Sequence, residues 1–154
     1  MEKNDRPEAF GVFKPVGHIV ISFRAADRLE AAADALRKQG FEASALVTYS
    51  PQEMITQADE DIAKAMPLAS LGQELNLVKA HRQLAEEGCS FLVVHAPDDA
   101  QAARVATVLL TAKAASAQQY GRFIIEELDV GARDEAQVFE SPDRGLDKAA
   151  TERR

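Results

Sequence analysis

The sequence is poor in features that would mark a compartment. One cysteine in 154 residues rules out a disulfide within the chain and fits a reducing cytoplasm. No stretch approaches the roughly 20 consecutive apolar residues that a membrane-spanning helix needs. The first residues, Met-Glu-Lys-Asn-Asp-Arg-Pro, lack the apolar run of a secretory signal. We therefore expect a cytoplasmic protein.

Positive charge is also scarce. The 18 lysines and arginines are outnumbered by 25 aspartates and glutamates, which gives a formal net charge of −7. Nucleic acids and anionic membranes are bound through a basic face, and a surface of net negative charge repels both. We therefore expect neither a nucleic-acid partner nor a membrane partner.

The common motifs of cofactor and catalytic sites are missing as well. No glycine-rich loop joins a strand to a helix, so neither a P-loop nor a dinucleotide-binding fingerprint is present. The histidines His18, His81 and His95 have no partner at metal-ligand spacing. Cys89, at the start of an apolar segment, is interpreted as a buried, inert thiol rather than a nucleophile. We expect no cofactor and no metal, and the lack of a catalytic constellation favours a non-enzymatic role.

What the sequence does contain is the hydrophobic pattern of one folded domain. Apolar residues make up 46% of the chain, an ordinary share for a globular protein. The run 89–96 includes four consecutive apolar residues and predicts a strand buried on both faces. We expect an N-terminal extension over 1–16, a single domain over 17–129 and a disordered, charged tail over 130–154.

The other elements follow from periodicity and from capping residues. Alternating apolar residues predict a first strand over 18–23, while the more polar segments 43–49 and 122–128 predict the second and last strands. Between the strands, Ser or Asp caps and terminal glycines or prolines predict helices over 27–40, 51–66, 70–88 and 98–121.

This order of elements fits two folds. One is an α+β fold, a ferredoxin-like four-stranded antiparallel sheet with a two-helix insertion between strands two and three; the other is a small parallel α/β sheet. We prefer the first, because the first and third strands are the most apolar. We place these two side by side at the centre and running parallel, with the second and fourth strands at the edges.

The apolar content of the first and third strands also bears on assembly. Both faces of these strands are apolar, and a single layer of helices cannot cover two faces of a sheet. The inserted helices could cover the open face or reach toward another subunit. We expect a homo-oligomer, specifically a dimer.

Two stretches resemble a known family. The stretch 17–49, with Ala-x-x-Leu ahead of Gly40-Phe41, and the stretch 88–97 together resemble the general stress protein 17M-like bacterial family. Members of that family are small ferredoxin-like domains with a helical insertion before the third strand. The resemblance implies a stress-associated or regulatory role, exercised through oligomerisation and an unknown protein partner. It carries over no catalytic residues.

A second resemblance implies a different function. The stretch 93–128 is similar in rhythm to the nitrogen-regulatory PII-like proteins, which are trimeric ligand sensors. Their long nucleotide-binding loop has no counterpart of matching sequence here. This resemblance implies a sensor of a small anionic ligand, as an alternative to the partner-binding role.

One candidate ligand site follows from the predicted sheet. Arg24 after the first strand, His95 near the end of the third and Arg122 at the start of the last are expected to meet at one edge. Such a cluster would attract a carboxylate or phosphate group. If the histidine must be charged to hold the anion, binding weakens as pH rises. The alternative is that the arginines pair with nearby acids and His95 packs in the sheet.

A second candidate is a basic patch on the helix predicted over 70–88. Its members are Lys79, His81 and Arg82, which we place on the side of the helix away from Leu75 and Val78. The simpler interpretation is a solvated face. The alternative is a contact with an acidic surface, either the helix over 53–61 or a partner protein.

Overall fold

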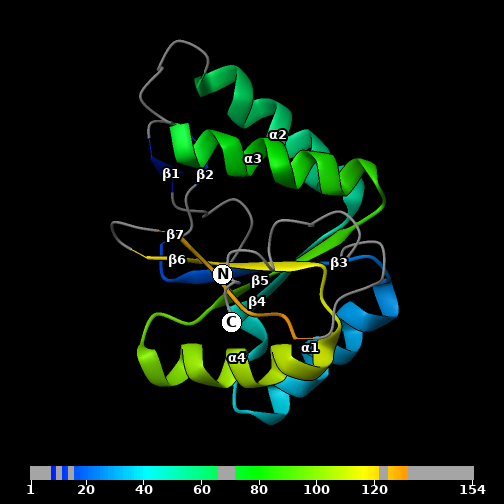
Figure 1. Cartoon of the computed structure of the whole chain (residues 1–154), viewed down its shortest axis with the longest axis vertical. Helices are drawn as coiled ribbons and strands as arrows, with labels where there is room; N and C mark the ends of the chain where they lie inside the picture. Colours follow the sequence, from blue (N-terminus) through cyan, green and yellow to red (C-terminus); the bar gives the residue numbers. More distant parts are fainter. Residues whose placement is uncertain (1–7, 10–11, 14–15, 66–71, 122–124, 132–154) are drawn as a thin grey trace, which may run out of the picture.

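The protein is an α+β fold built on an antiparallel sheet. The computed structural model describes residues 8–9, 12–13, 16–65, 72–121 and 125–131. The sheet has five strands in the order β4-β5-β3-β6-β7, and every neighbouring pair is antiparallel (Figure 1). These strands are β3 (His18–Phe23), β4 (Leu46–Tyr49), β5 (Ser90–His95), β6 (Ser116–Tyr120) and β7 (Ile125–Glu127).

Helices cover both faces of this sheet. On one face lie α1 (Ala26–Lys38) and α4 (Asp99–Ala112), which contact each other (Figure 1). On the other lie α2 (Pro51–Ala65) and α3 (Gly72–Glu86), the two helices inserted between β4 and β5. Because the inserted helices cover the second face, the argument that an uncovered face requires a dimer does not hold.

The face under α1 and α4 has a continuous apolar core. Every second residue of β3 points to it, namely Ile19, Ile21 and Phe23, as the period of a strand requires. The apolar stripes of the two helices meet these residues, together with the segment after β7. The fully buried contributors from these elements are Leu36, Val105, Leu109 and Val130.

The face under α2 and α3 has a second core. Val20, Phe91 and Val93 of the sheet pack against Met54 at the start of α2 and Ala85 near the end of α3. Farther along the helix pair, a separate small cluster joins α2 to α3 and includes no sheet residue. Helix α2 therefore packs on the sheet at its beginning and mainly on α3 after that.

Both ends of the described chain add to the body. Strands β1 (Glu8–Ala9) and β2 (Val12–Phe13) form a short antiparallel hairpin, and β2 contacts α2 and α3. Val130 is fully buried, so the folded body extends past the boundary expected at residue 129. The rest of the expected tail, 132–154, lies outside the described residues.

The segment predicted as one long helix over 98–121 is a helix followed by a strand. Helix α4 ends at Ala112, where Lys113 adopts a left-handed conformation with φ 58°, and β6 follows, paired with β3. The prediction was wrong because Ala, Lys and Gln favour helices. Pairing with β3 overrides that preference. β7 lies within the strand predicted over 122–128. Residues 122–124 of that prediction lie outside the described residues.

The central strands correct a second prediction. β3 and β5 are neighbours, as expected, but they run antiparallel: His18 pairs with His95 and Phe23 pairs with Ser90. The two edge strands are β4 and β7, which correspond to the predicted second and last strands, while the unpredicted β6 lies between β3 and β7.

The predicted helix caps have different outcomes. The capping boxes at Ser50 with Glu53 and at Asp98 with Gln101 are present. Asp27 is not a cap, since α1 begins after Ala25 without a side-chain cap.

Candidate functional site

Because β3 and β5 run antiparallel, two residues of the predicted ligand site lie at opposite ends of the sheet. Arg24 follows the end of β3, and its Nη1 lies 3.1 Å from Oε1 of Glu87, just before the start of β5. His95 ends β5 and is opposite His18 at the start of β3. Arg24 is six residues beyond His18, so at about 3.4 Å per residue the two predicted site residues are about 20 Å apart along the sheet. Arg122 lies outside the described residues.

His95 instead lines a pocket with other residues. The pocket has a volume of about 320 Å³ and lies where η2 (Ala43–Ala45) and the end of β5 meet the first turns of α4. We call it the sheet-end pocket. Its polar lining residues are Glu42, Ser44, His95, Gln101 and Arg104.

Local sequence signals explain how the chain forms the first wall of the sheet-end pocket. At the end of α1, Gly40 has φ 101°, a conformation that glycine adopts without a steric cost. The N–H of Phe41 then donates to the carbonyl oxygen of Leu36 at 3.1 Å, and the Phe41 side chain is buried. This anchor turns the chain, so that the following residue, Glu42, lies at the pocket.

The other wall is the first part of α4. The carboxylate of Asp98 accepts a hydrogen bond from the N–H of Gln101 at 2.8 Å, and the Gln101 side chain accepts one from the N–H of Asp98. Gln101 and Arg104 are three residues apart and therefore lie on the same side of the helix. The capping box thus fixes the helix start that carries both residues to the pocket.

The charges of the sheet-end pocket are not neutralised within the described part of the chain. Among the described residues, the side chains of Arg104 and Glu42 form no ion pair and no hydrogen bond. Both side chains are exposed. The guanidinium of Arg104 offers planar, paired N–H donors that match a carboxylate or phosphate group.

The His95 side chain packs against a second histidine. Its ring centroid is 4.7 Å from that of His18, and the ring planes are tilted by 35°. His18 is buried, and its Nδ1 lies 3.1 Å from the carbonyl oxygen of Val16. The exposed imidazole of His95 therefore rests against a fixed neighbour.

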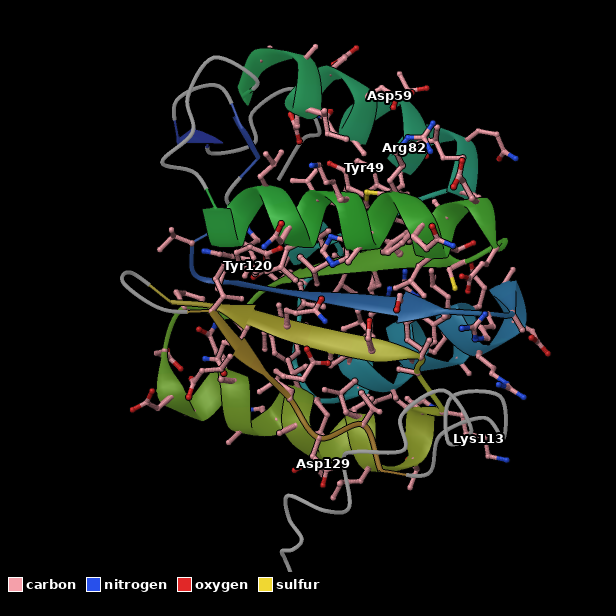
Figure 2. The ribbon with its side chains drawn as sticks, turned by 45° about the horizontal axis from the view of Figure 1, so that its top comes forward. Tyr49, Asp59, Arg82, Lys113, Tyr120 and Asp129 are labelled. Atoms are coloured by element: carbon pink, nitrogen blue, oxygen red, sulfur yellow. The ribbon has the colours of Figure 1, made fainter. Side chains whose placement is uncertain are left out.

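The residues of the predicted basic patch do not share one environment. Lys79 is exposed, whereas His81 is buried against the sheet. Arg82 Nε donates to Asp59 Oδ1 of α2 at 2.7 Å, and its Nη1 donates to Glu86 Oε2 at 2.6 Å (Figure 2). These hydrogen bonds, that to Asp59 foremost, raise the pKa of Arg82 above its usual value.

One residue of the basic patch meets the acidic helix. Arg82 does contact the acidic helix, but within the same chain. His81 contradicts the assignment, because it lies at helical spacing from Val78 and Ala85, on the apolar side of α3. That spacing was the signal for its burial.

Burial places His81 in a polar chain that crosses the second face of the sheet. His81 Nε2 donates to Gln118 Oε1 at 2.9 Å, and Gln118 Nε2 donates to Glu127 Oε1 at 3.1 Å. The ring of Phe91 packs edge-on against the imidazole with centroids 5.5 Å apart. Desolvation lowers the pKa of His81 and outweighs the hydrogen bond to Gln118, which raises it.

Two kinds of feature are absent from the described part of the chain. No group of three or more His, Cys, Asp or Glu side chains there is placed to hold a metal ion. No helix in the described ranges has the length and apolar character needed to cross a membrane.

Comparisons with protein-family models, with curated proteins and with solved structures found no match to this chain. The interpretation of the site rests on the geometry of the chain itself.

Proposed function

We propose that the protein is a non-enzymatic regulatory protein that binds a small anionic ligand in the sheet-end pocket. The observation that carries this proposal is the state of Arg104. In this acidic chain, the arginines Arg24, Arg37 and Arg82 each pair with a carboxylate. Arg104 lines a pocket and has no such partner among the described residues.

The size and composition of the pocket also support a small ligand. A volume of about 320 Å³ is at the lower end of the range for small-molecule sites. Liquid water takes roughly 30 Å³ per molecule, so the pocket has the volume of about ten water molecules. The amide of Gln101 adds hydrogen-bond donors beside Arg104.

The experiment is a titration of the ¹⁵N-labelled protein followed by amide chemical shifts. The probes are acetate, succinate, inorganic phosphate and a set of amino acids, all at constant ionic strength. We expect at least one probe to shift the amides of Glu42, His95 and Gln101 in the wild type, and not in Arg104→Gln. Lys79→Gln, which removes an exposed cation from the opposite helix layer, is the matched control and should bind like the wild type.

If no probe shifts these amides at millimolar concentration, the proposed function is wrong. The same holds if Arg104→Gln binds as well as the wild type does.

A second candidate function is the partner-binding, stress-associated role that the family resemblance implies. The observation that favours it is the position of β4, which among the described strands is paired on one side only and offers a sheet edge to another chain. We propose a homodimer as its form. Light scattering that gives the mass of a monomer at micromolar concentration would contradict the dimer.

We also propose that the sheet is ferredoxin-like with one added strand. The strands β4, β5, β3 and β6 have the order two, three, one and four of that fold, and α2 with α3 forms the insertion. An experimental structure in which β6 pairs elsewhere would overturn this assignment.

A further inference from the structure

We infer that the ligand of the sheet-end pocket is a zwitterion of amino-acid size, with its carboxylate at Arg104 and its ammonium group at Glu42. This inference rests on the proposed function and names the class of ligand. The pocket presents two charges of opposite sign, and neither has a partner in the described part of the chain. A ligand that carries both charges can pair with both side chains at once.

A simple anion fits the pocket less well. Near Arg104 it would gain one favourable interaction, but it would also approach the carboxylate of Glu42 in the same pocket. Asp98 adds another carboxylate next to the lining residue Gln101. Like charges in one site oppose binding, and an ammonium group on the ligand turns this repulsion into attraction.

A simple cation is disfavoured for the same reason, with the charges exchanged. It would gain from Glu42 and lose from Arg104, and its binding would leave the guanidinium without an anion. The two charged side chains come from different elements, Glu42 from the loop after α1 and Arg104 from α4. They therefore contact a ligand from two sides, which selects for the separation of its charges as well as for their signs.

The neutral groups of the pocket agree with a ligand that has several polar atoms. The Oε1 atom of Gln101 is used in the capping box, which leaves its Nε2–H groups available to a carboxylate oxygen. A volume of about 320 Å³ admits amino acids with short or medium side chains.

The test compares matched probes that differ in the amino group. L-alanine, L-serine and L-glutamate are paired with propionate, 3-hydroxypropionate and glutarate, and ethylamine serves as the cation alone. Binding is measured by amide shifts of Glu42, His95 and Gln101 in the intact chain at low, constant ionic strength, because salt screens exposed charges. We expect at least one amino acid to bind about tenfold more tightly than its partner without the amino group, a difference of about 1.4 kcal/mol.

Two variants test which residues cause the preference for a ligand with an amino group. Glu42→Gln keeps the shape of the side chain and should abolish the preference for the amino group, while propionate and glutarate bind at least as well as before. Arg104→Gln should weaken the binding of every acid in the set. Glu30→Gln, an exposed glutamate of α1 outside the pocket, is the control and should keep the wild-type preference.

The outcomes separate this inference from the proposed function. If acids without an amino group bind the wild type as tightly as the amino acids do, the zwitterion is wrong and the anion site stands. If amino acids are preferred but Glu42→Gln keeps that preference, the assignment of Glu42 is wrong. If none of these probes binds, the zwitterion is wrong, and inorganic phosphate or succinate then decides whether the anion site stands.

Discussion

The two faces of the central sheet are both buried, but by different chemistry. Under α1 and α4 the buried cluster is apolar throughout. Under α2 and α3, hydrogen bonds join Ser22 to Ser116 and His81 to Gln118 among the apolar residues. All buried polar side chains in the described part of the chain lie on this second side.

The difference teaches what each face does for the fold. Apolar packing is nondirectional, so the first face gains stability from close fit alone. Buried hydrogen bonds are directional and costly to break, so the second face also fixes how the inserted helices sit on the sheet. The second face should therefore respond to pH and to single polar substitutions, and the first to lost volume.

The largest effect should come from emptying the apolar face. Leu109→Ala removes a fully buried side chain and should lower the free energy of unfolding by about 3 kcal/mol, through lost transfer energy and a cavity. Urea denaturation followed by circular dichroism measures it. Leu110→Ala, whose side chain is 54% exposed, is the control and should change stability by no more than about 0.5 kcal/mol. Equal effects would mean that this face is not closely packed.

On the polar face, Gln118→Leu should cost about 2 kcal/mol, because it leaves the buried N–H of His81 without its acceptor. The double variant His81→Phe with Gln118→Leu should recover much of this loss, since both polar partners are then replaced by apolar groups. A double-mutant cycle in urea gives the coupling energy. Additive losses would show that the two side chains do not depend on each other.

Acid should weaken the second face selectively. The pKa of His81 is lowered in the folded state from a value of 6.5, so below pH 6.5 the unfolded chain takes up a proton that the folded chain resists. The free energy of unfolding should fall with decreasing pH by up to about 1.4 kcal/mol per unit, until the pKa in the folded state is passed.

The measurement is the pH dependence of stability in the wild type and in His81→Gln, in which the added slope below pH 6.5 should be absent. His95→Gln removes an exposed imidazole and should keep that slope. If the wild type and His81→Gln lose stability in parallel, His81 is not the group responsible.

The smallest expected effect is a gain in stability at the end of α4, on the apolar face of the sheet. Lys113 ends α4 with φ 58°, a conformation that costs a non-glycine residue about 1 kcal/mol (Figure 2). Lys113→Gly removes this strain but loosens the unfolded chain, so the net gain should be about 0.5 kcal/mol. Thermal unfolding measures it. Lys113→Ala keeps the strained conformation and should bring no gain; an equal gain would point to the lysine side chain instead.

Signals within a few residues could be predicted from the sequence. The capping boxes at Ser50 and Asp98 are present, and Gly40 and Gly88 follow the ends of their helices with positive φ. Each of these features depends on contacts along one turn, so neighbouring residues determine it. The apolar runs of β3 and β5 identified the two most buried strands for the same reason.

The candidate site could be predicted only in part. His95 was identified because it ends the most apolar strand, but Glu42 and Arg104 carry no local mark and line the same pocket only through the fold. Arg24 was assigned to the same edge on the assumption of parallel strands, and the antiparallel register places it at the other end. No residue in either strand encodes that direction, which is set by the connections and by cross-strand pairing.

The sequence by itself determined where helices start, which strands are central, and that the chain is acidic and apolar enough for one core. Tertiary structure decided the rest. It made a strand of 116–120, whose composition favours a helix, because pairing with β3 and burial of Ala117 and Tyr120 outweigh a propensity of a few tenths of a kcal/mol per residue. It also brought Glu42 and Arg104 to one pocket, since side chains far apart in sequence meet only when the sheet and helices are packed.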